Sequence, residues 1–180
     1  MIDIWLEFVK AMFILFPAYA ANGFPPLARG SLPIDFKKKW PDGNRVLGDG
    51  KTIEGFSIGL IAGAFVGALE SFVEPFLNSY ATMWSVQIPP MNFLIGFLIA
   101  FGALFGDSCG SFIKRRFGFE RGKEVLFLDQ WNFVIGAVIF TFLFTPITIW
   151  MLLLMLILTF VIHRIANIIG HKLKVKKEPW

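Results

Sequence analysis

Two carboxylates stand at the edges of apolar segments, where they could serve one metal-dependent reaction. Asp107 lies late in the apolar stretch 91–113, and Ser111 and Lys114 follow it at i+4 and i+7, which places all three on one helical stripe. Asp129 opens the next apolar segment, where it could also act only as a helix cap. A carboxylate at membrane depth is costly unless it is paired or binds a cation. Two such groups beside basic residues predict a Mg²⁺ site that shares its ion with substrate phosphates.

A glycine-rich approach to another apolar segment predicts contact with an anion. The run Gly48-Asp49-Gly50-Lys51-Thr52 leads directly into the segment 53–73, whose helix would present its amino terminus there. A P-loop is excluded, because that motif needs Gly at the position of Arg45. We expect Lys51 and Thr52 to contact phosphate, with a solvated turn as the alternative.

The composition indicates that these residues belong to a membrane protein. Of the 180 residues, 56% are hydrophobic and only 17% are charged, against about 25% in an ordinary globular chain. A chain of this size cannot bury so much apolar surface in water. The same numbers exclude a disordered segment and a nucleic-acid module, and the single cysteine, Cys109, excludes an internal disulfide scaffold.

Hydropathy predicts an all-α polytopic membrane protein, with one domain over residues 1–180. Residues 131–162 carry no charge and are too long for one crossing, so we expect a break at Thr145-Pro146. The five predicted transmembrane helices are 2–21, 53–73, 91–113, 129–145 and 147–168.

The basic residues orient these five spans. Segment 22–52 holds six Lys and Arg, segment 114–128 holds five, and the chain after 163 holds five more, which makes 16 of 17. Five spans place all three segments on one side, so the positive-inside rule puts the amino terminus outside and the carboxyl terminus in the cytoplasm. The predicted location is the cell membrane, with loops 22–52 and 114–128 and the site facing the cytoplasm. Lys10 is the exception, and we expect it to pair with Asp3 or Glu7 on its own helix.

Glycines at four-residue spacing predict close contact between helices. The second span carries Gly55, Gly59, Gly63 and Gly67, and the third carries Gly102, Gly106 and Gly110. Small residues at this spacing let helix backbones approach each other in lipid. Packing within the chain and packing between chains would look alike, so the pattern leaves the oligomeric state open.

The same residues resemble a known family. Gly106-Asp107, Ser111, Lys114-Arg115 and Leu128-Asp129 are similar to the GD-x₃-S-x₂-KR … LD core of the membrane CTP-transferases, the CDP-diacylglycerol synthase superfamily. Its short archaeal branch, the CDP-archaeol synthases, is the more similar, through Asn22-Gly23-Phe24-Pro25, Asp49-Gly50-Lys51-Thr52 and Leu128-Asp129-Gln130.

The resemblance implies a cytidylyltransferase with CTP, a geranylgeranyl ether lipid phosphate and the bilayer as partners, and no nucleic acid. CTP and 2,3-bis-O-geranylgeranylglycerol 1-phosphate would give the CDP-activated lipid and pyrophosphate. Asp107 and Asp129 would hold Mg²⁺ and, with Lys114, act in catalysis. The nucleotide would be bound by Asn22, Asp49, Gly50, Lys51, Thr52, Ser111, Lys114, Arg115 and Gln130. A CTP-dependent polyprenol kinase and a small membrane transporter remain the alternatives.

Overall fold

Helices make up nearly all of the regular structure. The computed structural model describes residues 4–81, 87–120, 123–142 and 144–174. In these residues the elements are α1 (Ile4–Gly23), the short 3₁₀ helix η1 (Pro25–Ala28), α2 (Ile53–Ala81), α3 (Phe93–Arg116), α4 (Leu128–Thr141) and α5 (Ile149–Lys172). Extended pairing in the described residues is limited to two isolated bridges, Pro33 with Thr52 and Lys39 with Arg45. The prediction of an all-α protein is therefore confirmed.

Within the described residues, four segments are long and apolar enough to cross a membrane: Ile4–Ala28, Ile53–Ala81, Phe93–Arg116 and Ile149–Lys172. The chain does form two helices after residue 127, with the expected interruption around Pro146. However, α4 has 14 residues, which is about 21 Å of helix against a hydrocarbon core of about 30 Å. The five-span topology and the orientation of the termini therefore stay predictions.

Proline does not end either of the first two long helices. α1 contains Pro17 and continues to Gly23, close to the predicted end at residue 21, while α2 continues through Pro75 to Ala81, beyond the predicted end at residue 73. Inside a membrane bundle, neighbouring helices can satisfy the backbone groups that proline frees.

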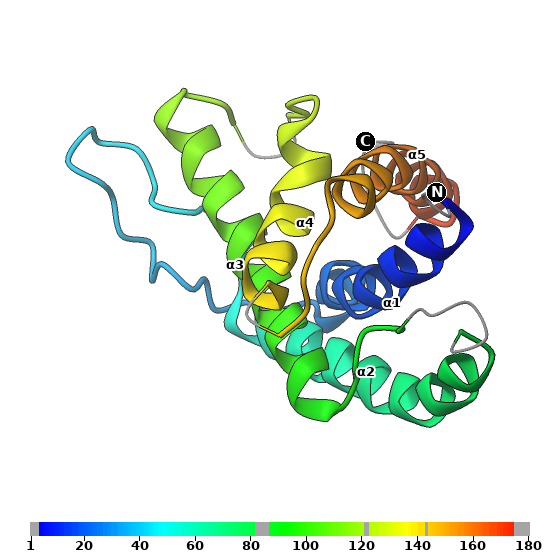
Figure 1. Ribbon diagram of the computed structural model, residues 1–180. Helices are drawn as coiled ribbons and strands as arrows, with labels where there is room; N and C mark the ends of the chain where they lie inside the picture. The colour runs from blue at the N-terminus through cyan, green and yellow to red at the C-terminus, as the bar shows by residue number, and fades with distance from the viewer. Residues whose placement is uncertain (1–3, 82–86, 121–122, 143, 175–180) are drawn as a thin grey trace.

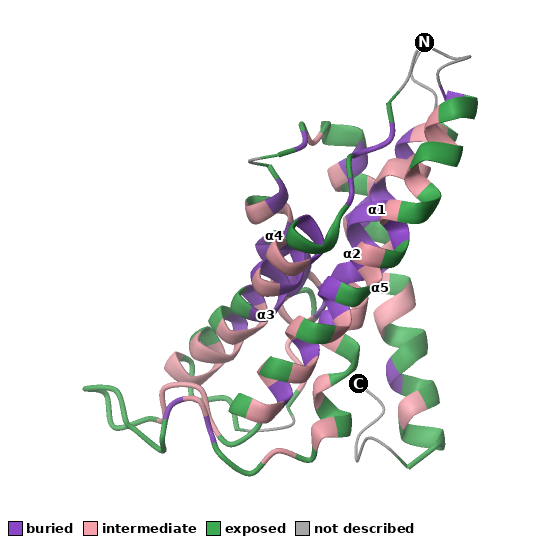
Figure 2. Ribbon diagram, turned by 90° about the horizontal axis from the view of Figure 1, so that it is seen from below, coloured by how far each residue is buried: buried purple, intermediate pink, exposed green. Residues whose placement is uncertain are grey.

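α3 and α4 lie side by side (Figure 1), and the helices run roughly along the length of an elongated bundle (Figure 2). α1 begins at one end of the bundle, and α5 ends at the other end (Figure 2). The segments that join α1 to α2 and α3 to α4 gather at this second end, which we call the loop end.

The glycine stripes bring backbones into contact, as predicted. A Cβ on Gly59 would lie 2.5 Å from the carbonyl oxygen of Ala21 in α1, and one on Gly67 would lie 2.5 Å from Cα of Gly96 in α3. A Cβ on Gly102 would lie 2.5 Å from the carbonyl oxygen of Gly136 in α4. Because no side chain fits at these crossings, the stripes fix the distances between α1, α2, α3 and α4.

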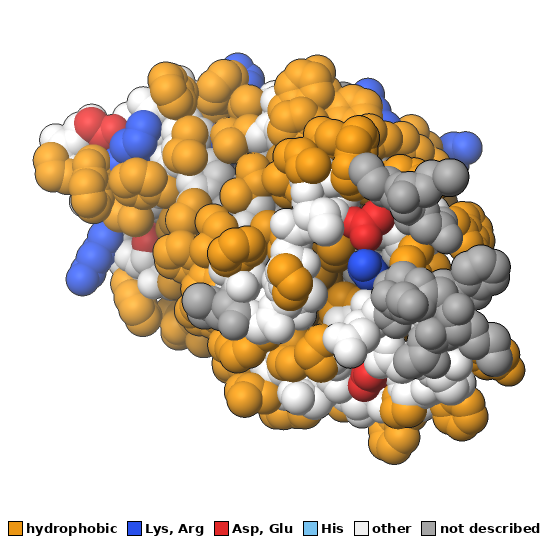
Figure 3. Space-filling view, viewed as in Figure 1, with side chains coloured by type: hydrophobic (Ala, Val, Ile, Leu, Met, Phe, Trp, Pro, Cys, Tyr) orange, Lys and Arg blue, Asp and Glu red, His pale blue; other side chains and the backbone are white. Residues whose placement is uncertain are grey.

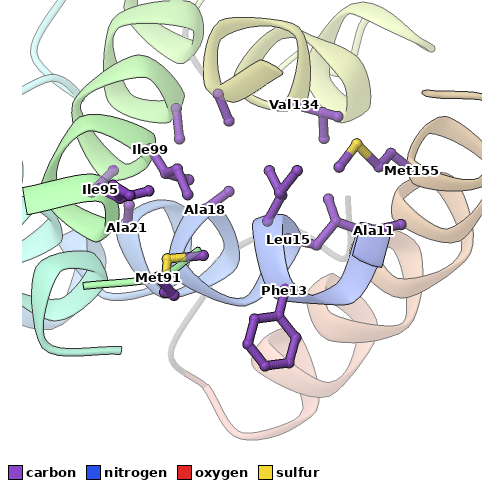
Figure 4. Close-up of a cluster of buried hydrophobic side chains, with 14 of the residues drawn as sticks. Ala11, Phe13, Leu15, Ala18, Ala21, Met91, Ile95, Ile99, Val134 and Met155 are labelled. Atoms are coloured by element: carbon purple, nitrogen blue, oxygen red, sulfur yellow. The ribbon is translucent and has the colours of Figure 1, made fainter. Parts of the chain in front are cut away.

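Side chains from four helices fill the centre. Leu15 and Ala18 of α1, Ile99 of α3, Val134 of α4 and Met155 of α5 converge in one buried cluster (Figure 4). The outer surface is also apolar, and orange hydrophobic side chains cover most of the face in Figure 3. An apolar interior inside an apolar surface is what a bilayer requires.

Lys10, which lies outside the three basic segments of the sequence, is paired. Lys10 donates to Glu7 at 3.1 Å, and Glu7 also accepts from the hydroxyl of Thr148, the N-cap residue of α5. The expected pairing with Glu7 is confirmed, while Asp3 lies outside the described residues.

Candidate functional site

A cavity of about 410 Å³ opens at the loop end. Its walls come from the end of α1, η1, the segment 29–52, the first turn of α2, the later half of α3, the start of α4 and the last turns of α5. Eight of the predicted site residues line it: Asn22, Asp49, Gly50, Lys51, Thr52, Asp107, Lys114 and Asp129. Segments more than one hundred residues apart in sequence therefore meet at one site.

Two lysine–carboxylate pairs dominate the charge of the cavity. Lys51 donates to Asp107, which joins the segment before α2 to α3. Lys114 lies 2.9 Å from both carboxylate oxygens of Asp129, and it also donates to the carbonyl oxygen of Lys123 at 2.6 Å. Each carboxylate is thus neutralised by a lysine from another element, which offsets the cost of holding it near the membrane.

Asp129 lies in the first turn of α4 and is not its cap. Residue 127 holds the N-cap position, and no side chain caps this helix. One carboxylate oxygen of Asp129 accepts from the backbone N–H of Val125 at 2.9 Å. This bond folds the preceding loop over the helix start, so that the carboxylate faces Lys114 and the cavity.

The first amides of α2 have partners inside the protein. The hydroxyl of Thr52 accepts from the N–H of Gly55 at 3.1 Å, and the N–H of Ile53 donates to the carbonyl oxygen of Leu32 at 2.9 Å. These two amides are therefore not open to an anion. The side chain of Lys51 is the group of this segment that carries positive charge into the cavity.

Asp35 organises the loop that carries Lys51. Its side chain is 1% exposed and accepts from the backbone N–H groups of Lys37, Leu47 and Gly48 at 2.9–3.1 Å. Arg45 donates to both of its oxygens, at 2.7 and 3.3 Å, and reaches Asp49 at 2.8 Å. Burial opposes the charged form, but the bonds from Arg45 and from the three amides outweigh it and hold the pKa of Asp35 well below its ordinary value.

Arg116 fastens this loop to α3. Its guanidinium lies 4.7 Å from the ring centre of Phe112 and 5.7 Å from that of Trp40. It also donates to the carbonyl oxygen of Arg45 at 2.5 Å and lies 3.3 Å from a carboxylate oxygen of Asp42. The basic run at the end of α3 is therefore divided, with Lys114 in the cavity and Arg116 holding the loop.

Three predicted nucleotide-binding residues lie outside the cavity wall. Ser111 is partly buried on α3, one turn beyond Asp107. Arg115 donates to the carbonyl oxygen of Phe119 and lies beside Gly48. Gln130 is 2% exposed and donates to Glu124 at 3.1 Å, and Glu124 in turn pairs with Arg164 of α5 at 2.8 Å.

The cavity also contains polar residues that no motif indicated. His163 and Asn167 of α5 line it, and so do Lys123 and Ser108. The spacing of His163 and Asn167, one helical turn apart in a strongly apolar segment, was the available signal.

The site can hold a hard cation only with help from a ligand. In the described residues, no group of three or more His, Cys, Asp or Glu side chains is placed to share a metal ion. Three carboxylates, Asp49, Asp107 and Asp129, do line the cavity, and Mg²⁺ is commonly bound by one or two carboxylates together with substrate phosphates and water. The donor set therefore fits a metal–phosphate complex rather than a metal alone.

Comparisons with known proteins agree with each other. A family model described as "CarS-like: CDP-archaeol synthase" matches residues 1–180. A CDP-archaeol synthase of Methanospirillum hungatei is 45% identical over 172 residues, covering 92% of this chain and all of that one. One of Pyrococcus horikoshii is 41% identical, covering 97% of this chain and 98% of that one.

A solved structure of "an intramembrane enzyme for archaeal membrane lipids biosynthesis" is also similar. Its TM-score is 0.75 and its sequence identity is 36%, over 88% of this chain and 92% of that one. The similarity thus extends to the arrangement of the helices as well as to the sequence.

Proposed function

The chain belongs to the CDP-archaeol synthase family, and on that premise we propose that its loop-end cavity joins CTP to an archaeal ether lipid phosphate. The protein is a cytidylyltransferase of archaeal membrane lipid synthesis. The preferred acceptor is 2,3-bis-O-geranylgeranylglycerol 1-phosphate, and the products are the CDP-activated lipid and pyrophosphate.

One observation carries this function most directly, namely the two lysine–carboxylate pairs that face a single cavity at the end of an apolar bundle. A reaction between a triphosphate and a lipid phosphate needs positive charge close to the membrane surface. It also needs a polar chamber that a lipid headgroup can reach without its chains leaving the bilayer. The cavity offers both, because its walls are the ends of apolar helices.

The reaction needs no general base, because the lipid phosphate is already an anion. One of its oxygens forms a bond to the α-phosphorus of CTP, while the bond from that phosphorus to the oxygen bridging to the β-phosphorus breaks. The electron pair of the broken bond leaves with pyrophosphate. The protein therefore contributes by positioning the two substrates and by neutralising their charge.

Four basic side chains line the cavity: Arg29, Lys51, Lys114 and Lys123. We assign this role to Lys51 and Lys114, because these two are paired with Asp107 and Asp129. Each already neutralises a carboxylate of the cavity, so each can exchange that partner for a phosphate oxygen without losing its counter-charge. Asp107 and Asp129 would hold Mg²⁺ between them and the phosphates. When bound, the ion withdraws charge from the triphosphate.

Asn22 and Asp49 would orient the nucleotide from the wall formed by α1 and the loop. Gly50 and Thr52, which line the cavity, would also contact the nucleotide. Ser111, Arg115 and Gln130 would contribute to nucleotide binding in the same reaction. For Arg115 this role requires the side chain to move from Gly48 toward the cavity.

Orientation in the membrane belongs to the same proposal. Five spans in one domain, with the amino terminus outside, would place the loop end and its cavity in the cytoplasm, where CTP is made. Labelling of a single cysteine introduced at exposed Trp40 by a membrane-impermeant reagent tests it, with Cys109 first replaced by Ser. Labelling in intact cells would contradict this orientation, and labelling only after lysis would support it.

The alternatives are separable by product. A polyprenol kinase would release CDP, and a transporter would show flux without CTP, but the comparisons favour neither. Purified protein, radiolabelled CTP and the geranylgeranyl lipid phosphate should give a labelled lipid and pyrophosphate.

Asp107→Asn and Asp129→Asn should abolish most of that turnover, while Asp42→Asn, an exposed carboxylate of the loop, should retain it. Near wild-type rates in both of the first two variants, with normal folding, would contradict the metal assignment.

A further inference from the structure

We propose that His163 and Asn167 of α5 form the subsite that binds the phosphate of the acceptor lipid, across the cavity from Lys51. The inference rests on the proposed function and assigns residues that the motifs of this chain do not include. It follows from the polar stripe on α5, from the position of α5 in the bundle and from the geometry of the reaction.

α5 carries a polar stripe where an apolar one would be expected. Thr159, His163 and Asn167 follow each other at i, i+4 and i+8, on the same side of the helix. Thr159 is 0% exposed and Asn167 is 3% exposed, so the stripe faces the interior of the protein and not lipid. The hydroxyl of Thr159 pairs with that of Tyr19 in α1 at 2.9 Å, and its two successors reach the cavity.

The two cavity residues of this stripe hold each other in position. The side-chain amide of Asn167 lies 3.2 Å from Nδ1 of His163. The amide N–H of Asn167 can donate to Nδ1, which fixes the two side chains relative to each other. The ring also packs against Phe133, with 6.2 Å between the ring centres. The pair thus places two polar side chains of fixed relative position on the cavity wall, where they can bind the oxygens of a phosphate monoester.

The position of α5 separates this pair from the nucleotide side. In the described part of the chain, α5 packs against α1 and α4 but not against α2 or α3. Lys51 and Thr52 precede α2, and Asp107 belongs to α3. Both sets of residues line one cavity, and because α5 does not pack against α2 or α3 we assign them to different walls.

The reaction geometry assigns the two walls. In-line displacement places the attacking oxygen and the leaving pyrophosphate on opposite sides of the α-phosphorus. If the triphosphate lies against Lys51, the acceptor phosphate must approach from the α5 side. Lys123, which lines the cavity beside Lys114, adds positive charge for this second phosphate.

Access for a lipid agrees with this assignment. α5 is the least buried of the four long apolar helices, so its outer face contacts the bilayer over most of its length. Exposed Ile165 and Ile168 flank the polar pair on that face. A headgroup can therefore reach His163 and Asn167 while its two chains remain along α5 in lipid.

Two matched pairs of variants test the subsite. His163→Ala is compared with His171→Ala, an exposed histidine on the same helix, and Asn167→Ala is compared with Ile61→Ala, a change at an exposed residue of α2. For each variant we would measure the KM for the lipid phosphate, the Kd for CTP by calorimetry and the melting temperature. His163→Gln serves as a conservative second variant if the alanine form does not fold.

We expect the KM for the lipid phosphate to rise about tenfold to a hundredfold in His163→Ala and Asn167→Ala, the range for losing a hydrogen bond to a charged group. The Kd for CTP should stay near the wild-type value, and His163→Gln should recover part of the loss. Both control variants should behave like the wild type.

Three results would overturn the assignment. An unchanged KM for the lipid phosphate in both variants would show that the pair does not touch the acceptor. A weakened affinity for CTP with an unchanged lipid KM would place the nucleotide on this wall instead. Failure of the wild-type protein to form any CDP-lipid would overturn the proposed function and this subsite together.

Discussion

Replacing Asp35 with Asn should disorder the loop that presents Lys51 and weaken CTP binding without unfolding the helical bundle. The carboxylate accepts five N–H groups, three from the backbone and two from Arg45. An Asn side chain has only one oxygen that can accept these hydrogen bonds. Its NH₂ group, itself a donor, would face the N–H groups that the second oxygen of Asp35 accepts. Asp35 lies outside the helices, so the bundle should retain its melting temperature.

The cost can be bounded from the environment of the pair. Breaking a buried ion pair costs roughly 3–5 kcal/mol. The lower end applies because Arg45 is 23% exposed and retains Asp49 as a partner. About 3 kcal/mol corresponds to about a hundredfold change in the population of the ordered loop. The Kd for CTP should then rise by about tenfold and at most about a hundredfold, in proportion to the lost population.

Calorimetry with CTP and limited proteolysis of the exposed segment 36–44 measure the two consequences separately. Asp42→Asn is the matched control, because Asp42 is an exposed carboxylate of the same loop whose pair with Arg116 is 3.3 Å long. Such a pair is worth about 0–1 kcal/mol, so the control should change affinity by less than about fivefold. Unchanged CTP affinity and unchanged protease resistance in Asp35→Asn would refute the reasoning.

The same residue predicts a pH dependence. Because the folded loop lowers the pKa of Asp35, the carboxylate contributes stability that is fully present above the ordinary aspartate pKa of about 3.9. That contribution is lost as the pH falls through the lower pKa of the folded state. Protease resistance of the loop should therefore be constant from neutral pH down to about pH 4 and fall below it. In Asp35→Asn this acid transition should be absent.

Three further predictions concern packing, catalysis and the contact that holds the loop. Gly136→Ala should lower the free energy of unfolding by about 1–3 kcal/mol, because its Cβ would meet the carbonyl oxygen of Gly102 at the α3–α4 crossing. Gly23→Ala is the control in the same melting experiment and should be neutral, because there is open space around Gly23. Lys114→Ala should lower kcat by roughly a hundredfold to a thousandfold in the CDP-lipid assay, because it removes a cation from the reacting phosphates and leaves Asp129 without its lysine. A change confined to KM would contradict that role. Arg116→Lys should weaken CTP binding and expose the loop to protease, because an ammonium group cannot both stack on two rings and reach the backbone carbonyl. An unchanged protease pattern would exclude Arg116 as the residue that holds the loop.

Several residues that line the cavity could be predicted from the sequence because they are chemically conspicuous there. Asp107 and Asp129 are carboxylates at the edges of apolar segments, and Lys51 and Thr52 stand at the start of a helix. The structure brings these four residues to one cavity, with Asn22, Asp49, Gly50 and Lys114. His163 and Asn167 were missed because a polar pair on an apolar helix carries no motif.

The sequence alone could not assign individual members of a basic run. Lys114, Arg115 and Arg116 are adjacent and chemically alike, yet Lys114 enters the cavity, Arg115 lies beside Gly48, and Arg116 stacks on two rings. Successive residues of a helix point about 100° apart. Which of them meets the site therefore depends on where the neighbouring elements lie.

The sequence by itself determined the class of molecule, the helical periodicity and the inventory of chemistry. Hydropathy and charge are properties of the chain, and they act on every residue whatever its neighbours are. Only the tertiary structure decided which charges pair, because Lys51 with Asp107 and Lys114 with Asp129 are contacts across elements. Such pairs depend on the distances that the glycine crossings impose on the helices, and those distances exist only when the bundle is assembled.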